Sequence, residues 1–346
     1  MVAEETGLNG LSAEHVIVRE QYERRTPFFH NIDVADVSGG QRNTSVWSSG
    51  RSSLPDSKVH RLRDAVVYDS GAVVTVEGRV VPETLLRNVV PGGSREPHKR
   101  IEGTLALLRK PGDMNFGHWL VELLPRIRDF RQAAPEAHLR FGVPTHPISM
   151  LDLRLDTLAL YGVGREDVVW LSNDAVIVDD LMFMTSNSIH SHTHDAAGVR
   201  DLVSRARAAA GALSGERRLY VRRPDHLKRR LLNEDEIASR LADEGFEIVH
   251  PEQMAFREQV RTFAEARYIV GVSGAALTNL IWARTPVDVL SLAPNAPGEF
   301  FFWDLANITG ARFSTVFGRA CDAPPTVHSN FTLEVSWLDR WLSLTR

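Results

Sequence analysis

The sequence NFGHWLVELLPRI, which begins at Asn115, carries polar side chains at a helical spacing. His118, Glu122 and Arg126 stand at i, i+4 and i+8, so a helix places them close to one face. The leucines between them supply an apolar, buried face. With Trp119 on the same helix, this pattern predicts the wall of a site. The alternative is a histidine with only a structural role.

A second segment with the residue types for chemistry is GVSGAALTN, residues 271–279, at the end of an expected strand. Small residues let a ligand approach the backbone, and the N–H groups of a helix N-terminus attract anions. The arginine-rich run RRPDHLKRR leaves another strand of the same expected sheet, and in a parallel sheet both exits face one crevice. A diphosphate clamp without metal is the functional interpretation, and a tight turn beside a solvated basic loop is the structural one. The residues of this clamp are Arg222, Arg223, Arg229, Arg230, Gly274 and Ala275.

The sequence IHSHTHD places His190, His192 and His194 at alternating positions, which an extended strand would turn to one face. A metal site is one interpretation, and a loop that lines a cleft between domains is the other. No pair of aspartates has the D-x-D spacing, which is the common ligand of magnesium or manganese in one large class of sugar transferases. We therefore expect no metal and no other cofactor.

Composition narrows the function classes. The chain has 346 residues with 40 Lys+Arg against 44 Asp+Glu, and this net charge of −4 argues against nucleic acid as a partner. Only four of the 40 cations are lysines, so arginine is in large excess, through codon bias or through binding of phosphate and carboxylate groups. Cys321 is the single cysteine, which excludes an intrachain disulfide and a cysteine-ligated zinc site.

No signal peptide and no apolar stretch of membrane-spanning length is visible in the sequence. These observations predict a cytoplasmic protein. Peripheral contact with the inner face of a membrane is the alternative for its location.

The second half of the sequence alternates strands and helices. Expected strands cover residues 217–223, 247–251, 267–272, 287–294 and 312–318, and expected helices cover 233–246, 256–266, 274–283 and 300–309. Asn233 with Glu236 has the spacing of a capping box. Such alternation predicts a doubly wound parallel sheet.

The first half is less regular. Expected strands cover residues 104–110, 139–143, 168–171 and 175–185, and expected helices cover 116–132 and 151–161. Short antiparallel strands are expected over 64–81, and the Ser/Gly-rich stretch 37–58 is predicted to be a loop. A final amphipathic helix is expected over 333–344.

In their order along the chain, these segments resemble glycosyltransferase family 61, whose bacterial members are described as capsular polysaccharide biosynthesis proteins. The resemblance runs from about residue 105 to 292 and rests on NFGHWLVELLPR, RLYVRR…RRLLNEDEI, GFEIVHPEQMAFREQVRTFAEARYIVG and GAALTN. The sequence departs from the family pattern at two positions. Ser273 stands where the family usually has histidine, and Ser291 stands where it usually has glutamate.

The resemblance implies an α/β protein with two Rossmann-like domains in a GT-B-like arrangement. It implies an inverting, metal-independent transfer of a sugar from a nucleotide-sugar donor to a glycan, glycolipid or small-molecule acceptor. The predicted parts are an N-terminal extension (1–60), an acceptor-side α/β domain (61–212), a nucleotide-sugar-binding domain (213–325) and a C-terminal helix that packs back on the domains (326–346).

The resemblance also distributes roles over the segments. The predicted catalytic base is Glu122 or His118, which would take the acceptor proton. The predicted donor-binding residues are Arg222, Arg223, Arg229, Arg230, Ser273, Gly274, Ala275, Ala276, Asn279 and Ser291. The predicted acceptor or cleft residues are Asn115, Trp119, Arg126, His190, His192 and His194.

Two other function classes stay open at this point. Ser273 and Ser291 fit a non-catalytic relative that only binds a nucleotide-sugar or a glycan. The three alternating histidines fit a metal-dependent hydrolase. Metal content of the purified protein and turnover with a sugar donor separate the three hypotheses.

Overall fold

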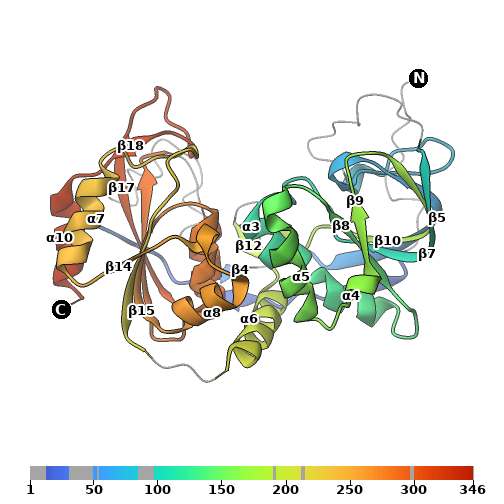
Figure 1. Ribbon diagram of the computed structural model, residues 1–346, viewed down its shortest axis with the longest axis horizontal. Helices are drawn as coiled ribbons and strands as arrows, with labels where there is room; N and C mark the ends of the chain where they lie inside the picture. Colours follow the sequence, from blue (N-terminus) through green and yellow to red (C-terminus); the bar gives the residue numbers. More distant parts are fainter. Residues whose placement is uncertain are drawn as a thin grey trace. The chain divides into compact units, whose positions relative to one another are not determined.

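The computed structural model describes residues 13–30, 50–52, 54–84, 97–189, 192–211, 215–296 and 300–345. They form two compact mixed α/β units, each containing a sheet with parallel strands (Figure 1). The first unit comprises described residues within Met1–Glu20, Leu54–Ile189 and Ala197–Leu202. The second comprises those within Gln21–Ser53, His190–Ala196 and Val203–Arg346. Both units therefore draw on separated stretches of chain, whereas the predicted domains were contiguous.

The described part of the first unit has a mixed sheet in the order β1–β5–β10–β7–β8–β9, with β6 paired to β5. Its strands are β1 (His15–Ile17), β5 (Ser57–Val67), β6 (Val73–Val74), β7 (Lys99–Leu107), β8 (Arg140–Pro144), β9 (Val168–Leu171) and β10 (Val176–Met184). β10, β7, β8 and β9 are parallel, while β5 lies antiparallel to β10. The predicted strands at 104–110, 139–143, 168–171 and 175–185 are confirmed. β5 is longer than expected, because it begins in the stretch predicted as a loop.

The predicted helix over 116–132 is wrong as one continuous α-helix. The structure has α3 (Phe116–His118), a π-helical turn (Trp119–Leu123) and α4 (Arg126–Ala133). Pro125 provides the reason, because it has no N–H to donate and its ring crowds the preceding turn. The wider π-helical turn absorbs the break, and such turns are frequent at functional sites. The next predicted helix is present as α5 (Leu151–Ala159).

The second unit contains the regular sheet predicted from the alternating pattern. Its strands are β13 (Arg217–Val221), β14 (Glu247–Val249), β15 (Ala266–Val272), β16 (Asp288–Pro294) and β17 (Arg312–Ala320). They are parallel, in the order β14–β13–β15–β16–β17. The edge of β17 pairs with β3 (Phe28–Phe29) and with β18 (Phe331–Thr332). β3 comes from the predicted N-terminal extension, so part of that extension belongs to this sheet.

Helices cover the second sheet on two sides, with α7 (Glu234–Asp243) and α10 (Val335–Ser343) on one and α8 (Phe256–Ala264) on the other (Figure 1). The core on the α7 and α10 side joins apolar side chains of both helices to the strands. Ile237, Val270 and Trp341 are buried members of this core. The predicted last helix therefore packs on the second unit. Within the described residues, no helix has the length and apolarity needed to cross a membrane.

Two local predictions in the second unit are wrong. The segment after β15 is a 3-10 helix (Ala275–Trp282), here called η8, and not an α-helix. The Asn233 side chain does not accept a hydrogen bond from the first turn of α7. Its Oδ1 instead accepts the N–H of Leu333, while its Nδ2 donates to the Leu333 carbonyl and to Glu236 Oε2, so the two predicted residues touch without forming the cap. A partner 100 residues away in the sequence has replaced the local cap.

Candidate active site

The first cluster of polar side chains forms where the chain leaves β7 and enters α3. The connecting loop is held by Arg109, whose Nε donates to Asp113 Oδ2 at 2.9 Å, and by Arg154, which donates to the Asp113 carbonyl at 3.1 Å. Asn115 caps α3, because its Oδ1 accepts hydrogen bonds from the N–H groups of Gly117 and His118. The cap and the fixed loop bring Lys110 and the start of the helix together.

Glu122 lies at the centre of this cluster and is 0% exposed. Its Oε2 forms an ion pair with Lys110 Nζ and lies 3.0 Å from His118 Nδ1. The Lys110 and His118 side chains are each 17% exposed, so they reach solvent while the carboxylate does not. A buried carboxylate requires such partners, since an isolated one is very costly to desolvate.

Backbone geometry holds the two helical members of the cluster in place. Gly112 adopts φ +88°, in the left-handed region, and the position of its missing Cβ lies 3.4 Å from His118 Cδ2. The imidazole therefore packs directly over this glycine. The carbonyl of Glu122 accepts a hydrogen bond from Asn187 Nδ2 at 2.8 Å. This contact satisfies a carbonyl at the end of the π-helical turn.

The other predicted residues of this helix have inward positions. Trp119 lies in the core, where its Nε1 donates to Thr157 Oγ1 at 3.0 Å. Arg126 is also buried, and burial lowers the pKa of its guanidinium to about 10, opposed by the charge of Glu122. The structure thus brings His118 and Glu122 together at a site, and it places Trp119 in the core.

The second cluster forms at the carboxyl ends of β13 and β15. A Cβ on Gly274 would lie 1.9 Å from Arg223 Nη1, so only glycine lets this guanidinium pack against the turn. Arg229 is buried and donates from Nη1 to the Ser273 carbonyl at 2.8 Å. Its φ of 65° is rare for a side chain of this size, and such backbone outliers concentrate at functional sites.

The two positions at which the sequence departs from the family pattern contact each other. Ser273 Oγ and Ser291 Oγ form a hydrogen bond of 2.6 Å, and both side chains are buried. The two serines meet because β15 and β16 are neighbouring parallel strands. Gly271, two residues before Ser273, is in register with Ser291. The two departures are therefore one paired feature of the turn, which the sequence separation of 18 residues conceals.

The remaining predicted donor residues divide into two groups. Ala275 and Ala276 are half-buried at the start of η8, beside the Ser273–Gly274 turn. Asn279 is buried, and its side-chain amide forms hydrogen bonds with Gln259 and Trp282. Arg222 and Arg230 face carboxylates instead of the turn: Arg222 forms an ion pair with Asp235, and Arg230 lies 3.8 Å from Asp225. Of the four predicted arginines, Arg223 and Arg229 contact the turn.

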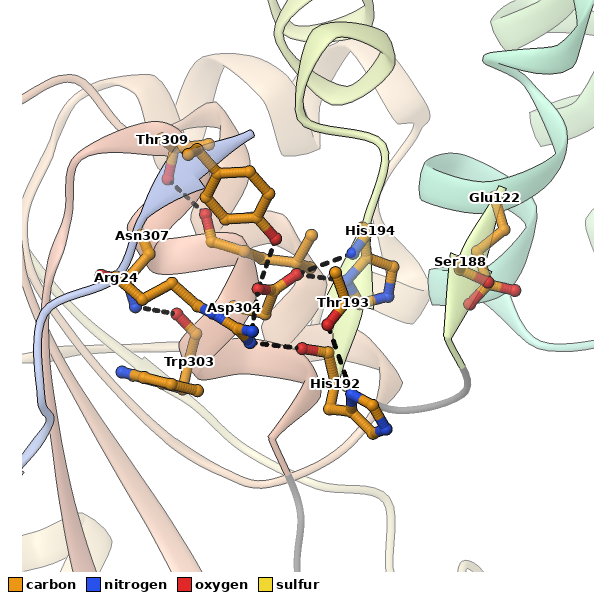
Figure 2. A network of polar contacts seen from close by, with 12 residues as sticks. Arg24, Glu122, Ser188, His192, Thr193, His194, Trp303, Asp304, Asn307 and Thr309 are labelled. Carbon is orange, nitrogen blue, oxygen red and sulfur yellow. Dashed lines mark hydrogen bonds and ion pairs between the residues drawn. The ribbon is translucent and has the colours of Figure 1, made fainter. Parts of the chain in front are cut away.

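The described part of the histidine-rich segment joins a buried network in the second unit (Figure 2). His194 Nδ1 lies 2.8 Å from Asp304 Oδ2, which also accepts the His194 backbone N–H. Asp304 Oδ1 accepts hydrogen bonds from Tyr22 Oη at 2.5 Å and from Arg24 at 3.2 Å. Burial and the adjacent Asp304 charge raise the pKa of the Tyr22 hydroxyl far above its usual range. Both carboxylate oxygens of Asp304 therefore have two polar contacts each, and these contacts connect the helix that contains Asp304 to the separate stretches of chain that contain Tyr22 and His194.

The predicted face of three alternating histidines is not formed by the described residues. His192 lies in a turn and His194 in the short strand β12 (Thr193–His194), while His190 lies outside the described residues. Across the described ranges, no group of three or more His, Cys, Asp or Glu side chains is arranged to hold a metal ion. The metal-dependent hydrolase stays a prediction from the sequence.

Sequence reasoning missed Lys110 and Asp304. Lys110 is one of only four lysines and is the last residue of the expected strand over 104–110, which is a weak signal for a role. Asp304 gave no signal, because it stands in an apolar helical segment, α9 (Phe301–Thr309). Its partners Tyr22 and His194 are 282 and 110 residues away in the sequence.

Comparison with known proteins now identifies the class. A family model described as Glycosyltransferase 61 matches residues 116–290, just over half of the chain. The protein is therefore a glycosyltransferase, and it belongs to glycosyltransferase family 61. The segment from α3 to the first residues of β16 lies inside the match, and with it His118, Glu122, Arg223, Arg229 and Ser273.

Solved structures give more distant similarities. The chain is similar to the E. coli heptosyltransferase WaaC with ADP, at 11% identity and a TM-score of 0.34, over 71% of this chain and 100% of that one. It is also similar to the same enzyme with ADP-2-deoxy-2-fluoro heptose, at 10% identity and a TM-score of 0.30, with the same coverage. Neither likeness assigns a substrate to this chain. A comparison with curated protein sequences returned no match.

Proposed function

We propose that this glycosyltransferase is an inverting, metal-independent enzyme that uses a nucleotide-sugar donor. One observation carries the proposal: the buried Glu122 carboxylate with Lys110 and His118 at a π-helical turn. The parallel strand order of the second unit supports a Rossmann-like donor domain, and two α/β units support a GT-B-like protein.

His118 is the proposed base, and Glu122 is its positioning residue. Glu122 has no exposed surface, whereas the imidazole reaches solvent and can touch an acceptor hydroxyl. A proton on Nδ1, next to Glu122 Oε2, leaves Nε2 as the nitrogen that accepts a proton. Lys110 neutralises the carboxylate, so Glu122 orients the ring and does not itself compete for the acceptor proton.

The proposed reaction is a direct displacement at the anomeric carbon. The acceptor oxygen forms a bond to that carbon, and the bond from the carbon to the diphosphate oxygen breaks with its electron pair. His118 Nε2 takes the acceptor proton, and the nucleoside diphosphate leaves with the negative charge. Attack on the face opposite the leaving group inverts the anomeric configuration.

The proposed diphosphate site is the Ser273–Gly274 turn with the start of η8. Arg223 packs against Gly274, and the backbone N–H groups at Gly274 and Ala275 open the 3-10 helix. A guanidinium fork and backbone donors stabilise developing charge on a leaving diphosphate. Arg229 is a positioning residue here, since its guanidinium holds the Ser273 carbonyl.

The acceptor is proposed to be a hydroxyl-bearing glycan, glycolipid or small metabolite. The proposed location is the cytoplasm or the inner face of a membrane.

The test is turnover with a panel of UDP-, dTDP-, GDP- and ADP-sugars, followed by NMR of the product's anomeric configuration. His118→Ala should lower kcat by about 10²- to 10⁴-fold, the usual contribution of a general base. The matched control is His138→Ala, because the His138 side chain of the same unit is 79% exposed. Full turnover in His118→Ala, a retained configuration, or loss of activity with a chelator would each contradict the proposal.

A further inference from the structure

A cavity lies at the edge of the parallel sheet opposite the Ser273–Gly274 turn in the second unit. It has a volume of about 520 Å³, within the range of ligand pockets. Its lining includes Tyr268 at the start of β15, Asp288 at the start of β16 and Phe313 at the start of β17. Because these strands are parallel, their starts all lie at the amino edge of the sheet.

This cavity is separate from the proposed donor turn. The Ser273–Gly274 turn follows the carboxyl end of β15, and β15 is seven residues long. At about 3.3 Å per residue, the two ends of that strand lie about 20 Å apart. The amino-edge cavity therefore has no role in binding the donor diphosphate.

Positive charge predominates around the cavity. Arg25, Arg267 and Arg312 line it together with one carboxylate, Asp288, which leaves an excess of two positive charges. Arg312 and Arg267 both contact Asp288, with Arg267 Nη1 at 3.0 Å from Asp288 Oδ2. The exposed Arg25 guanidinium has no ion-pair partner in the part of the chain that the structure describes. An anionic ligand complements this set.

Aromatic rings and one buried imidazole complete the lining. Phe28 is 58% exposed, and Tyr268 and Trp341 also face the cavity. His30 is only 4% exposed, and neither of its ring nitrogens has a hydrogen-bond partner among the described residues. A buried polar group without a partner is rare and costly, so a ligand that bonds to His30 accounts for it.

We propose that this cavity is a second carbohydrate site, which binds an acidic sugar unit of a glycan. The carboxylate of a uronate, or the phosphate of a phosphorylated sugar, meets Arg25. The apolar face of the pyranose ring packs on Phe28, and a ring hydroxyl forms a hydrogen bond with His30. The site is independent of the donor turn and holds an anionic saccharide away from the reacting atoms.

The experiment measures binding of defined probes to the full chain by calorimetry and ligand-observed NMR. A hyaluronan tetrasaccharide supplies uronates, glucose 1-phosphate supplies a sugar phosphate, and cellotetraose is the neutral control. Either anionic probe should bind, and cellotetraose should not. Arg25→Ala should weaken binding by about tenfold, the effect of one charge-assisted contact.

His30→Phe separates binding from packing. Phenylalanine fills the volume of the ring without nitrogens, so the melting temperature should hold or rise while the affinity for the probe falls. Arg257→Ala is the matched control for Arg25→Ala, since Arg257 is an exposed arginine on α8 of the same unit. Arg223→Ala should impair sugar transfer and leave probe binding unchanged, which distinguishes this site from the donor site.

Three results would overturn the proposal. The first is equal binding of cellotetraose and the anionic probes. The second is unchanged affinity in both Arg25→Ala and His30→Phe. The third is binding only to phosphatidylglycerol vesicles, with no binding of either anionic saccharide, which would make the surface a lipid contact.

Discussion

Substitution of Lys110 by methionine tests the proposed organisation of the first cluster. Methionine keeps most of the apolar stem and removes the charge next to Glu122. The carboxylate is 0% exposed, so it cannot recover its hydration when the cation is lost. Removal of one partner from a buried ion pair costs about 3 to 5 kcal/mol in the free energy of unfolding. Because Lys110 is 17% exposed and partly solvated, we expect the lower end of that range.

The double variant makes the prediction specific. Glu122→Gln alone leaves Lys110 able to reach water, and we expect a loss of about 1 to 3 kcal/mol from broken hydrogen bonds. In Lys110→Met/Glu122→Gln neither member of the Lys110–Glu122 pair carries a charge, so no carboxylate is left buried without its lysine. The double variant should therefore lose about 1 to 3 kcal/mol less than the sum of the single losses, as expected for residues in direct contact.

Urea unfolding followed by tryptophan fluorescence at pH 7 measures these losses. The transfer rate of Lys110→Met should also fall, since the lost ion pair no longer fixes the Glu122 carboxylate that positions His118. Lys99→Met, at an exposed position in β7, is the control and should stay within about 0.5 kcal/mol of the parent. Additive losses to within about 0.5 kcal/mol would refute the coupling of Lys110 and Glu122.

Three further predictions concern the second unit. Gly274→Ala places a Cβ 1.9 Å from Arg223 Nη1, which is the mobile end of a long side chain and can move away. The melting temperature should therefore change little, while KM for the donor should rise about tenfold because a charge-assisted contact is lost. Gly50→Ala is the control and should change neither quantity, since a Cβ there has no neighbour within 4 Å. Asp304→Asn leaves Tyr22 and Arg24 without an ionised acceptor and should cost about 3 kcal/mol in urea unfolding, whereas a loss below about 0.5 kcal/mol would contradict the network. Burial, with a smaller contribution from the Arg340 charge, lowers the pKa of His30 from 6.5 to about 4, so the unfolded chain binds more protons between these values. Stability should therefore be complete above pH 6.5 and fall by about 1 to 3 kcal/mol towards pH 4, and unfolding curves of His30→Phe should lack this decline.

The periodicity of apolar residues in the sequence was sufficient to predict most strands and helices of the second unit. Strands at 217–223 and 287–294 are confirmed as β13 and β16, because buried parallel strands are short apolar runs between polar helices. It failed where a single residue changed the local geometry. Pro125 divides the expected helix over 116–132, and the Asn233 Oδ1 accepts the N–H of Leu333 instead of capping the turn that follows it.

The candidate site was predictable in part. The spacing of His118 and Glu122 predicted that they lie on one helical face, and their distance of 3.0 Å agrees with it. The lysine that neutralises Glu122 was not predictable, because its position depends on how the loop after β7 folds. The arginine run predicted a cluster of positive side chains at one sheet edge. Only the structure shows that Arg222 forms an ion pair with Asp235 and does not contact the Ser273–Gly274 turn.

The sequence by itself determined the α/β class, the parallel sheet of the second unit and the family, because these depend on local periodicity and on ordered motifs. Only the tertiary structure decided which charges are buried and which atoms meet. Glu122 contacts Lys110 across 12 residues, Ser273 contacts Ser291 across 18, and Asp304 contacts Tyr22 across 282. The electrostatic properties of a carboxylate depend on burial and on its nearest charges, and both are properties of the packed chain.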